Sequence, residues 1–164
     1  MNGNTFEGDD SSSKSGGYSA AIVYNSQITI NDGKFTGGGF QVGYSGAKLI
    51  LKNTNINITS TNTSNRHCVY ATDGAYVEVN GGTFTFDTTK KRSYFYATNA
   101  TIIVNDCTCG KAPTHKDWKD PIYEASGGQV IIRGGRFGFD PTNWVDEGYE
   151  AVTDGKEWVV RPKQ

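Results

Sequence analysis

The residues of this chain that could do chemistry are basic and aromatic, and they gather in two segments. Ammonium and guanidinium groups bind carboxylates and other anions, and an indole ring offers an apolar face to the C–H surface of a sugar. Together these side chains suit a site for an acidic glycan, whereas solvated loop residues are the alternative interpretation. The segments contribute Lys90, Lys91 and Arg92, and then Lys111, His115, Lys116, Trp118 and Lys119, with Asp117 and Asp120 between them.

A tyrosine follows an apolar residue in four short segments. If the apolar residue points into a core, strand alternation sends the tyrosine to the outer face. The tyrosines would then form a ladder whose rings and hydroxyls suit a sugar. A stacking ladder that only stabilises the sheet is the alternative. The four pairs are Val23-Tyr24, Val69-Tyr70, Phe95-Tyr96 and Ile122-Tyr123, and Phe40-Gln41-Val42 is their counterpart in one further segment.

The acids of the sequence do not form a catalytic pattern. Glycoside hydrolysis needs two carboxylates about 5–10 Å apart, and lyase chemistry needs acids for calcium together with a basic residue. Asp9-Asp10 is the only adjacent pair of aspartates and lies in a Ser-rich segment. Asp32 and Asp106 share a repeat position at which other copies carry Asn or Gly, the usual corner residues. We therefore predict no catalytic residue.

Three cysteines are too few and odd in number for a disulfide framework. Cys107 and Cys109 form a single C-x-C, whereas a structural zinc site needs about four ligands. Cys68, His67 and His115 are scattered along the chain. We therefore predict neither a metal site nor a cofactor.

The elements that would position these residues follow from an internal repeat. Each copy is a strand of alternating apolar residues, a Gly/Asn/Asp corner and another apolar residue, and successive copies begin 21, 28, 25 and 28 residues apart. With 21 glycines and 12% aromatic residues, the composition is typical of many short strands joined by tight turns. The copies span Ile28–Phe35, Leu49–Ile56, Val77–Phe84, Ile102–Cys109 and Val130–Phe137.

Aligned copies place apolar residues in three columns. The first two columns lie two residues apart, on one face of a strand, and the third follows the corner. One coil cannot bury its own apolar face, but stacked coils can. We predict an all-β, right-handed parallel β-solenoid of about five to six coils, with a β-sandwich as the alternative. The columns are Ile28, Leu49, Val77, Ile102 and Val130; Ile30, Leu51, Val79, Val104 and Ile132; and Phe35, Ile56, Phe84, Cys109 and Phe137.

Longer insertions recur at one place in the repeat, after the third column. They are Thr59–His67, Asp87–Ser93 and Gly110–Asp120. Insertions collected at one place project from one edge, which in solenoids is often the binding edge. This edge would bring the two basic segments together from neighbouring coils.

The two ends of the sequence differ. Asn2–Phe6 matches a corner but has no strand before it, which predicts an incomplete first coil and further coils upstream in a longer parent protein, with a degenerate true start as the alternative. After Phe137 the repeat stops. Asp140-Pro141 predicts a helix start and Gly148 a helix stop, and Asp154-Gly155 between apolar runs predicts a hairpin.

We therefore predict solenoid coils over residues 1–137 and a helix-plus-hairpin cap over residues 138–164. Trp144, Tyr149 and Trp158 would supply the apolar bulk that covers the last coil. A sugar-binding aromatic cluster is their alternative role.

The repeated unit V-x-V-N-G-G-T-F resembles the pectate-lyase-like right-handed parallel β-helix superfamily. The ending G-G-R-F-G-F-D-P-T-N-W-V-D-E-G-Y-E-A-V is similar to a tailpiece of β-helical surface proteins of gut bacteria and of phage tail proteins. The first resemblance implies only a fold, and the second implies a C-terminal end. Many relatives of this fold cut polysaccharides, yet the N-T-D, D-D and G-H-G pattern of polygalacturonase-like enzymes is absent.

The net charge of -1 argues against a general nucleic-acid binder. The sequence contains no run of 18 apolar residues, the length that would predict a membrane span. We predict a non-catalytic carbohydrate- or receptor-binding segment of an extracellular protein on a bacterial surface or a virion, such as an adhesin or phage tail protein. A polysaccharide lyase or glycoside hydrolase fragment and a purely structural spacer are the alternatives. The oligomeric state, a homotrimer included, stays open. The predicted ligand-binding residues are Lys90, Lys91, Arg92, His115, Lys116, Trp118, Tyr70, Tyr96 and Tyr123.

Overall fold

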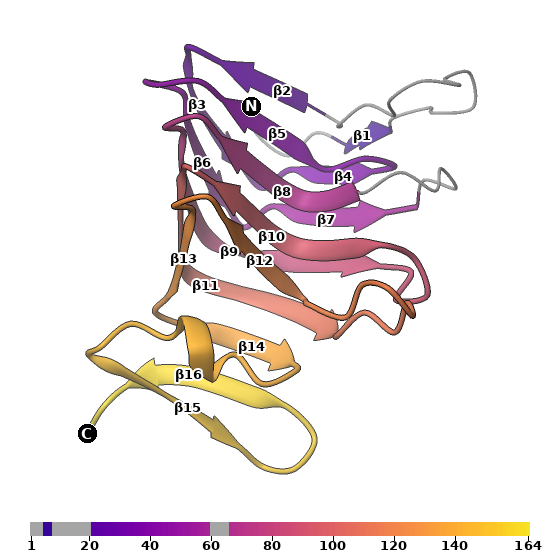
Figure 1. Cartoon of the computed structure of the whole chain (residues 1–164), viewed down its shortest axis with the longest axis vertical. Coiled ribbons are helices and arrows are strands. Elements are labelled where there is room, and N and C mark those ends of the chain that lie inside the picture. Colours follow the sequence, from indigo (N-terminus) through magenta and orange to yellow (C-terminus); the bar gives the residue numbers. More distant parts are fainter. Residues whose placement is uncertain (1–4, 8–20, 60–65) are drawn as a thin grey trace.

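The chain winds as a parallel β-solenoid whose two sheets share one hydrophobic core (Figure 1). The computed structural model describes residues 5–7, 21–59 and 66–164. The larger sheet contains β1 (Thr5–Glu7), β3 (Gln27–Asn31), β4 (Lys34–Thr36), β6 (Lys48–Lys52), β7 (Asn55–Ile58), β9 (Tyr76–Phe86), β11 (Thr101–Lys111), β13 (Gln129–Ile132), β14 (Gly135–Gly138), β15 (Tyr149–Thr153) and β16 (Trp158–Pro162). The smaller sheet contains β2 (Ala21–Tyr24), β5 (Phe40–Gly43), β8 (Arg66–Thr72), β10 (Arg92–Thr98) and β12 (Ile122–Ala125).

The predicted columns are confirmed by the strand register. In the first column Leu49 of β6 pairs with Ile28 of β3 on one side and with Val77 of β9 on the other. The third column continues past the corner, where Cys109 of β11 lies between Phe84 and Phe137. Cys109 therefore occupies a position that holds Phe or Ile in the other copies. The alternation of apolar residues sets this register, because a slip by one residue would turn every column outward.

The corners between strands use left-handed backbone at Asn and Asp residues. Asp32 has a φ of 54° and Asn53 a φ of 49°. Short amide and carboxyl side chains tolerate this conformation because they hydrogen-bond locally. The Asn53 Nδ2 donates to the Asp32 Oδ1 over 3.3 Å, so corners of successive coils also contact each other.

About three turns of the solenoid have parallel neighbours on both sides, namely β5–β7, β8–β9 and β10–β11. Before them, β2 and β3 each pair with a parallel strand on one side only among the described residues. After them, β14 pairs with an antiparallel strand. The predicted count of five to six coils is therefore not supported. The prediction counts every copy of the repeat as a full coil, including the first and the last copies.

The predicted cap helix is wrong. The only helical element in the described part of the chain is a 3-10 turn at Thr142–Trp144. Asp140 Oδ1 accepts hydrogen bonds from the Thr142 backbone N–H and hydroxyl at 3.0 and 2.5 Å. Beyond the turn, Val145 forms a parallel bridge with Ile132 and the Asp146 N–H donates to the Ile132 carbonyl. Pairing with the end of β13 thus uses the backbone that a longer helix would need.

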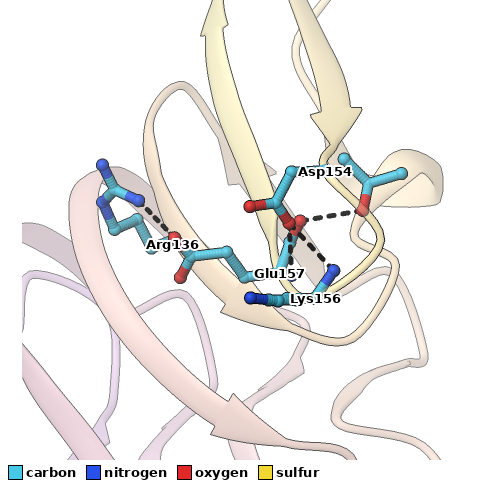
Figure 2. A network of polar contacts seen from close by, with 5 residues as sticks. Arg136, Asp154, Lys156 and Glu157 are labelled. Carbon is cyan, nitrogen blue, oxygen red and sulfur yellow. Dashed lines mark hydrogen bonds and ion pairs between the residues drawn. The ribbon is translucent and has the colours of Figure 1, made fainter.

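The predicted hairpin is confirmed, and it closes the larger sheet. β15 and β16 are antiparallel around the Asp154-Gly155 turn, and β16 pairs with β14. Figure 2 shows Arg136 of β14 paired with Glu157, and Asp154 Oδ1 accepting the Lys156 and Glu157 N–H groups at 2.8 and 3.1 Å. These N–H donors, Lys156 first, lower the pKa of Asp154. As predicted, Trp144, Tyr149 and Trp158 pack against the core.

Candidate functional site

A tyrosine ladder runs across the smaller sheet. Tyr70, Tyr96 and Tyr123 pair in register on β8, β10 and β12. The residue before each tyrosine is buried in the core, and each tyrosine is half-buried on the opposite face. The predicted outward ladder is therefore confirmed for these three residues. The buried predecessors are Val69, Phe95 and Ile122.

Tyr24 does not belong to the ladder, contrary to the sequence prediction. Gln41 of β5 holds the ladder position, opposite Tyr70, and Tyr24 pairs with Gly43 instead. The strand β2 is displaced by two residues from the predicted alignment, so that Ala21 rather than Val23 pairs with Phe40. A displacement by two residues preserves the alternation of sides.

Trp118, from the connection between β11 and β12, packs against the ladder. Its ring lies 5.1 Å from the Tyr123 ring and 6.2 Å from the Tyr96 ring, centroid to centroid. Tyr96 and Tyr123 are 4.7 Å apart, and all three ring planes lie within 26° of each other. The predicted loop tryptophan and the predicted ladder thus form one surface. We call it the aromatic patch, made of His67, Tyr70, Tyr96, Trp118 and Tyr123.

His67 belongs to the aromatic patch although it was not a predicted site residue. Its ring lies 4.6 Å from Tyr96 and 5.8 Å from Trp118, and its Nδ1 lies 2.5 Å from the Ser93 Oγ. Burial first, and then the charge of Arg92, lower the pKa of His67 to about 3. The imidazole is therefore neutral near pH 7 and acts as a ring and a hydrogen-bonding partner. The sequence signal that could have identified His67 as a site residue is its position three residues before Tyr70, at the start of the same strand.

The two basic connections lie side by side at one edge of the solenoid, as the repeat predicts (Figure 1). The Thr88 carbonyl accepts the Thr114 N–H at 2.6 Å and the Thr114 hydroxyl at 3.2 Å. His115 forms an antiparallel bridge with Trp118, and its Nδ1 accepts the Asp117 N–H at 3.1 Å. Residues 87–91 and 110–120 together carry five lysines and three aspartates, so the edge has a small positive excess.

The predicted basic residues do not all lie on the exposed edge. Lys116 is exposed, whereas Lys90, Lys91 and His115 are half-buried. Arg92 is only 1% exposed, and its Nη1 donates to the Lys91 carbonyl over 3.0 Å. The strand β10 begins at Arg92, and the side chain enters the protein interior. This placement does not support Arg92 as a ligand-contacting residue.

The three cysteines are free and buried. The Cys107 and Cys109 sulfurs lie 3.6 Å apart, and burial raises the pKa of Cys68 and of Cys109. A buried protonated thiol is a weak nucleophile. Among the residues that the structure describes, no three His, Cys, Asp or Glu side chains gather as metal ligands. The predicted insertion Thr59–His67 lies partly outside the described residues, and Asp9-Asp10 lies entirely outside them.

A hollow of about 380 Å³ in the cap contains carboxylates, but arginines pair with two of them. Asp146 accepts from the Arg133 Nε at 2.8 Å, and Glu150 accepts from the Arg161 Nε at 2.9 Å. The Asp146 pKa is lowered, mainly by its hydrogen bond to Arg133. The Arg133–Asp146 pair joins the end of β13 to the cap, and the Arg161–Glu150 pair joins β16 to β15.

Comparison with protein-family models, with curated proteins and with solved structures finds no match. In the described part of the chain, no helix has the length and apolar character to cross a membrane. The resemblance to the pectate-lyase-like superfamily thus stays a prediction.

Proposed function

We propose that this chain is a non-catalytic segment that binds an acidic glycan at the aromatic patch and the adjoining lysines. One observation carries the proposal. Trp118 comes from the basic edge and packs on Tyr96 and Tyr123 of the outer sheet face. Two features that are separate in the sequence, a cationic loop and an aromatic ladder, therefore form a continuous surface.

The surface has the chemistry that an acidic sugar requires. The half-buried rings offer apolar edges and, at the tyrosines, hydroxyl groups to a pyranose. Lys90, Lys91 and Lys116 supply ammonium groups that can bind a carboxylate or sulfate. His67 contributes no charge near neutral pH, because its pKa is lowered to about 3.

The proposal extends to the setting of the chain. We place it among right-handed, pectate-lyase-like β-helices. We also place it outside the cell, on a bacterial surface or a virion, where a glycan receptor would be met. Both statements rest on the repeat and on the resemblance of the C-terminal tailpiece.

A purely structural spacer is the second candidate, and ring packing favours it. Tyr96 and Tyr123 stack at 4.7 Å with 26° between their planes, so each covers part of the other ring. In a spacer, the patch would only hold neighbouring coils together. Truncating Trp118 would then change stability without changing any binding.

A glycan array with matched acidic and neutral oligosaccharides tests the proposed function. We expect binding to uronic acid or sulfated glycans that weakens as salt is raised. By titration calorimetry, Trp118→Ala and the double change Lys90→Ala with Lys91→Ala should each weaken binding at least about tenfold, or about 1.4 kcal/mol. Lys52→Ala, an exposed lysine at a corner of β6, is the matched control and should bind normally. An array without any acidic hit would refute the proposal in favour of the spacer.

A further inference from the structure

Two tyrosines outside the aromatic patch are unusually exposed. Tyr24 and Tyr44 are 42% and 52% exposed, more than any other large apolar side chain among the described residues. Their ring centroids lie 5.1 Å apart with 71° between the planes. The pair therefore presents an angled aromatic surface to solvent.

Tyr44 holds this position at a conformational cost. Its φ is 71°, in the left-handed region, which is unfavourable for a bulky L-residue. The equivalent turns of the other units carry small polar residues with positive φ, which tolerate it better. Because the Tyr44 side chain is exposed, burial in the core does not offset the conformational cost of its positive φ. Residues with such strained backbone gather at functional sites. The residues at the equivalent turns are Asn25, Asp73, Asn99 and Ser126.

The Tyr24 ring is held in place by two contacts. The Gln41 Nε2 donates to the Tyr24 hydroxyl over 3.0 Å. The ring also lies over Gly43, where a Cβ would stand 2.6 Å from the Tyr24 Cε1. Gly43 thus provides the space that the ring occupies. A side chain fixed before binding loses little entropy when a ligand arrives.

The surroundings of the pair are polar. Asn25, Ser26 and Ser45 are exposed beside the two rings in the sequence, and the backbone of Ser45 lies against Gly74 of the next turn. Amide and hydroxyl groups exchange hydrogen bonds with sugar hydroxyls. The nearest acid on that turn, Asp73, would accept a hydroxyl but repel a carboxylate.

We infer that Tyr24 and Tyr44 form a second subsite, which binds an uncharged pyranose ring. The inference rests on the proposed function, since it assumes a carbohydrate ligand, and it adds a neutral sugar to the specificity. β2 and β12 are the two ends of the five-stranded sheet. At a strand spacing of about 4.8 Å, β2 lies roughly 19 Å from β12, the strand that carries Tyr123. Separate residues therefore report on the two sites.

The test uses hexaoses of glucose, galactose and mannose as probes, with the tyrosine ring signals followed by NMR. Tyr44→Asn is the central variant, because Asn25 and Asn99 stand at the equivalent turns. We expect a neutral hexaose to shift the Tyr24 and Tyr44 signals, and Tyr44→Asn to weaken this binding at least tenfold. The denaturation midpoint of Tyr44→Asn should stay unchanged or rise, because the strain is relieved. Ser126→Asn, at the equivalent turn of a later unit, is the matched control and should keep binding.

Two results would overturn the inference. One is a lack of any shift at Tyr24 and Tyr44 with all three neutral hexaoses. The other is a Tyr44→Asn variant that keeps binding but has a lower denaturation midpoint, since Tyr44 would then serve packing alone. The indole N–H signal of Trp118 reports separately on acidic glycans. Its silence, together with shifts at Tyr24 and Tyr44, would refute the proposed acidic site and leave the neutral subsite standing.

Discussion

A single methyl group added at Gly82 would test how closely neighbouring coils stack. Gly82 lies in β9 with a φ of 108°. A Cβ at this position would stand 2.1 Å from the Thr54 carbonyl oxygen and 2.6 Å from its carbon. Thr54 is buried between β6 and β7, and these atoms belong to the backbone of the preceding coil. Gly82→Ala therefore forces backbone rather than a flexible side chain to move.

The expected cost follows from two contributions. Placing an L-residue in left-handed backbone costs about 1–2 kcal/mol, and overpacking a core costs roughly 1–3 kcal/mol more. Movement of Thr54 would also weaken its hydroxyl hydrogen bonds to the Ile30 and Lys52 carbonyls, now at 3.4 and 3.2 Å. We expect Gly82→Ala to lower the free energy of unfolding by about 3–5 kcal/mol, a large part of the stability of an ordinary domain.

Gly46→Ala is the matched control. Gly46 has a φ of 90°, and a Cβ there would meet no atom within 4 Å. This variant should lose only the backbone contribution of about 1–2 kcal/mol. Urea unfolding, followed by tryptophan fluorescence and far-ultraviolet circular dichroism, measures both costs. Equal losses in the two variants would refute the close approach of Gly82 to Thr54, and with it the tight stacking of neighbouring coils.

Three further predictions concern buried polar groups. Because the pKa of His67 falls to about 3 in the folded chain from an ordinary 6.5, the unfolded chain binds a proton that the folded chain does not. The free energy of unfolding should therefore fall as the pH falls from about 6.5, by up to about 1.4 kcal/mol per pH unit, and His67→Gln should flatten this slope in urea titrations at pH 4–7. Arg92→Ala should destabilise the chain by about 2–5 kcal/mol, because truncating this buried side chain leaves a cavity and removes its hydrogen bond to the Lys91 carbonyl, whereas equal melting behaviour of Arg92→Ala and Lys91→Ala would contradict the burial. The thiols of Cys68, Cys107 and Cys109 should react with an aromatic disulfide reagent at pH 8 only after denaturation, and rapid labelling of the native chain would contradict their burial.

The solenoid and its register could be predicted because each column residue depends on neighbours one coil away. Val77 and Val79 alternate with Glu78, and the same alternation in the adjoining copies leaves one register that buries both valines. The hairpin of the cap could be predicted from a short segment alone, because Asp154-Gly155 suits a tight turn between two strands. In these places the local pattern and the packed structure favour the same conformation.

The cap helix and the role of Arg92 could not be predicted, because non-local contacts decide both. Asp140-Pro141 suits a helix start, but the backbone of Val145 and Asp146 instead pairs with Ile132, thirteen or more residues earlier. Arg92 follows two lysines in the sequence and resembles the end of a charged loop. It is the first residue of β10, and its burial shows that the strand begins before the charged run ends.

The aromatic patch could be predicted from the sequence only in part. The repeat predicts which edge carries the Trp118 connection, but it does not predict that this connection folds back over the sheet. Trp118 contacts His67, which stands on β8, beyond the neighbouring strand β10. A contact across two strands leaves no trace in a column alignment, because it joins an insertion to a repeat position. For solenoids of this kind, binding residues are therefore best sought where a large aromatic residue of an insertion can reach a ladder on the outer sheet face. Here that rule leads from Trp118 to Tyr123, Tyr96 and His67 in turn.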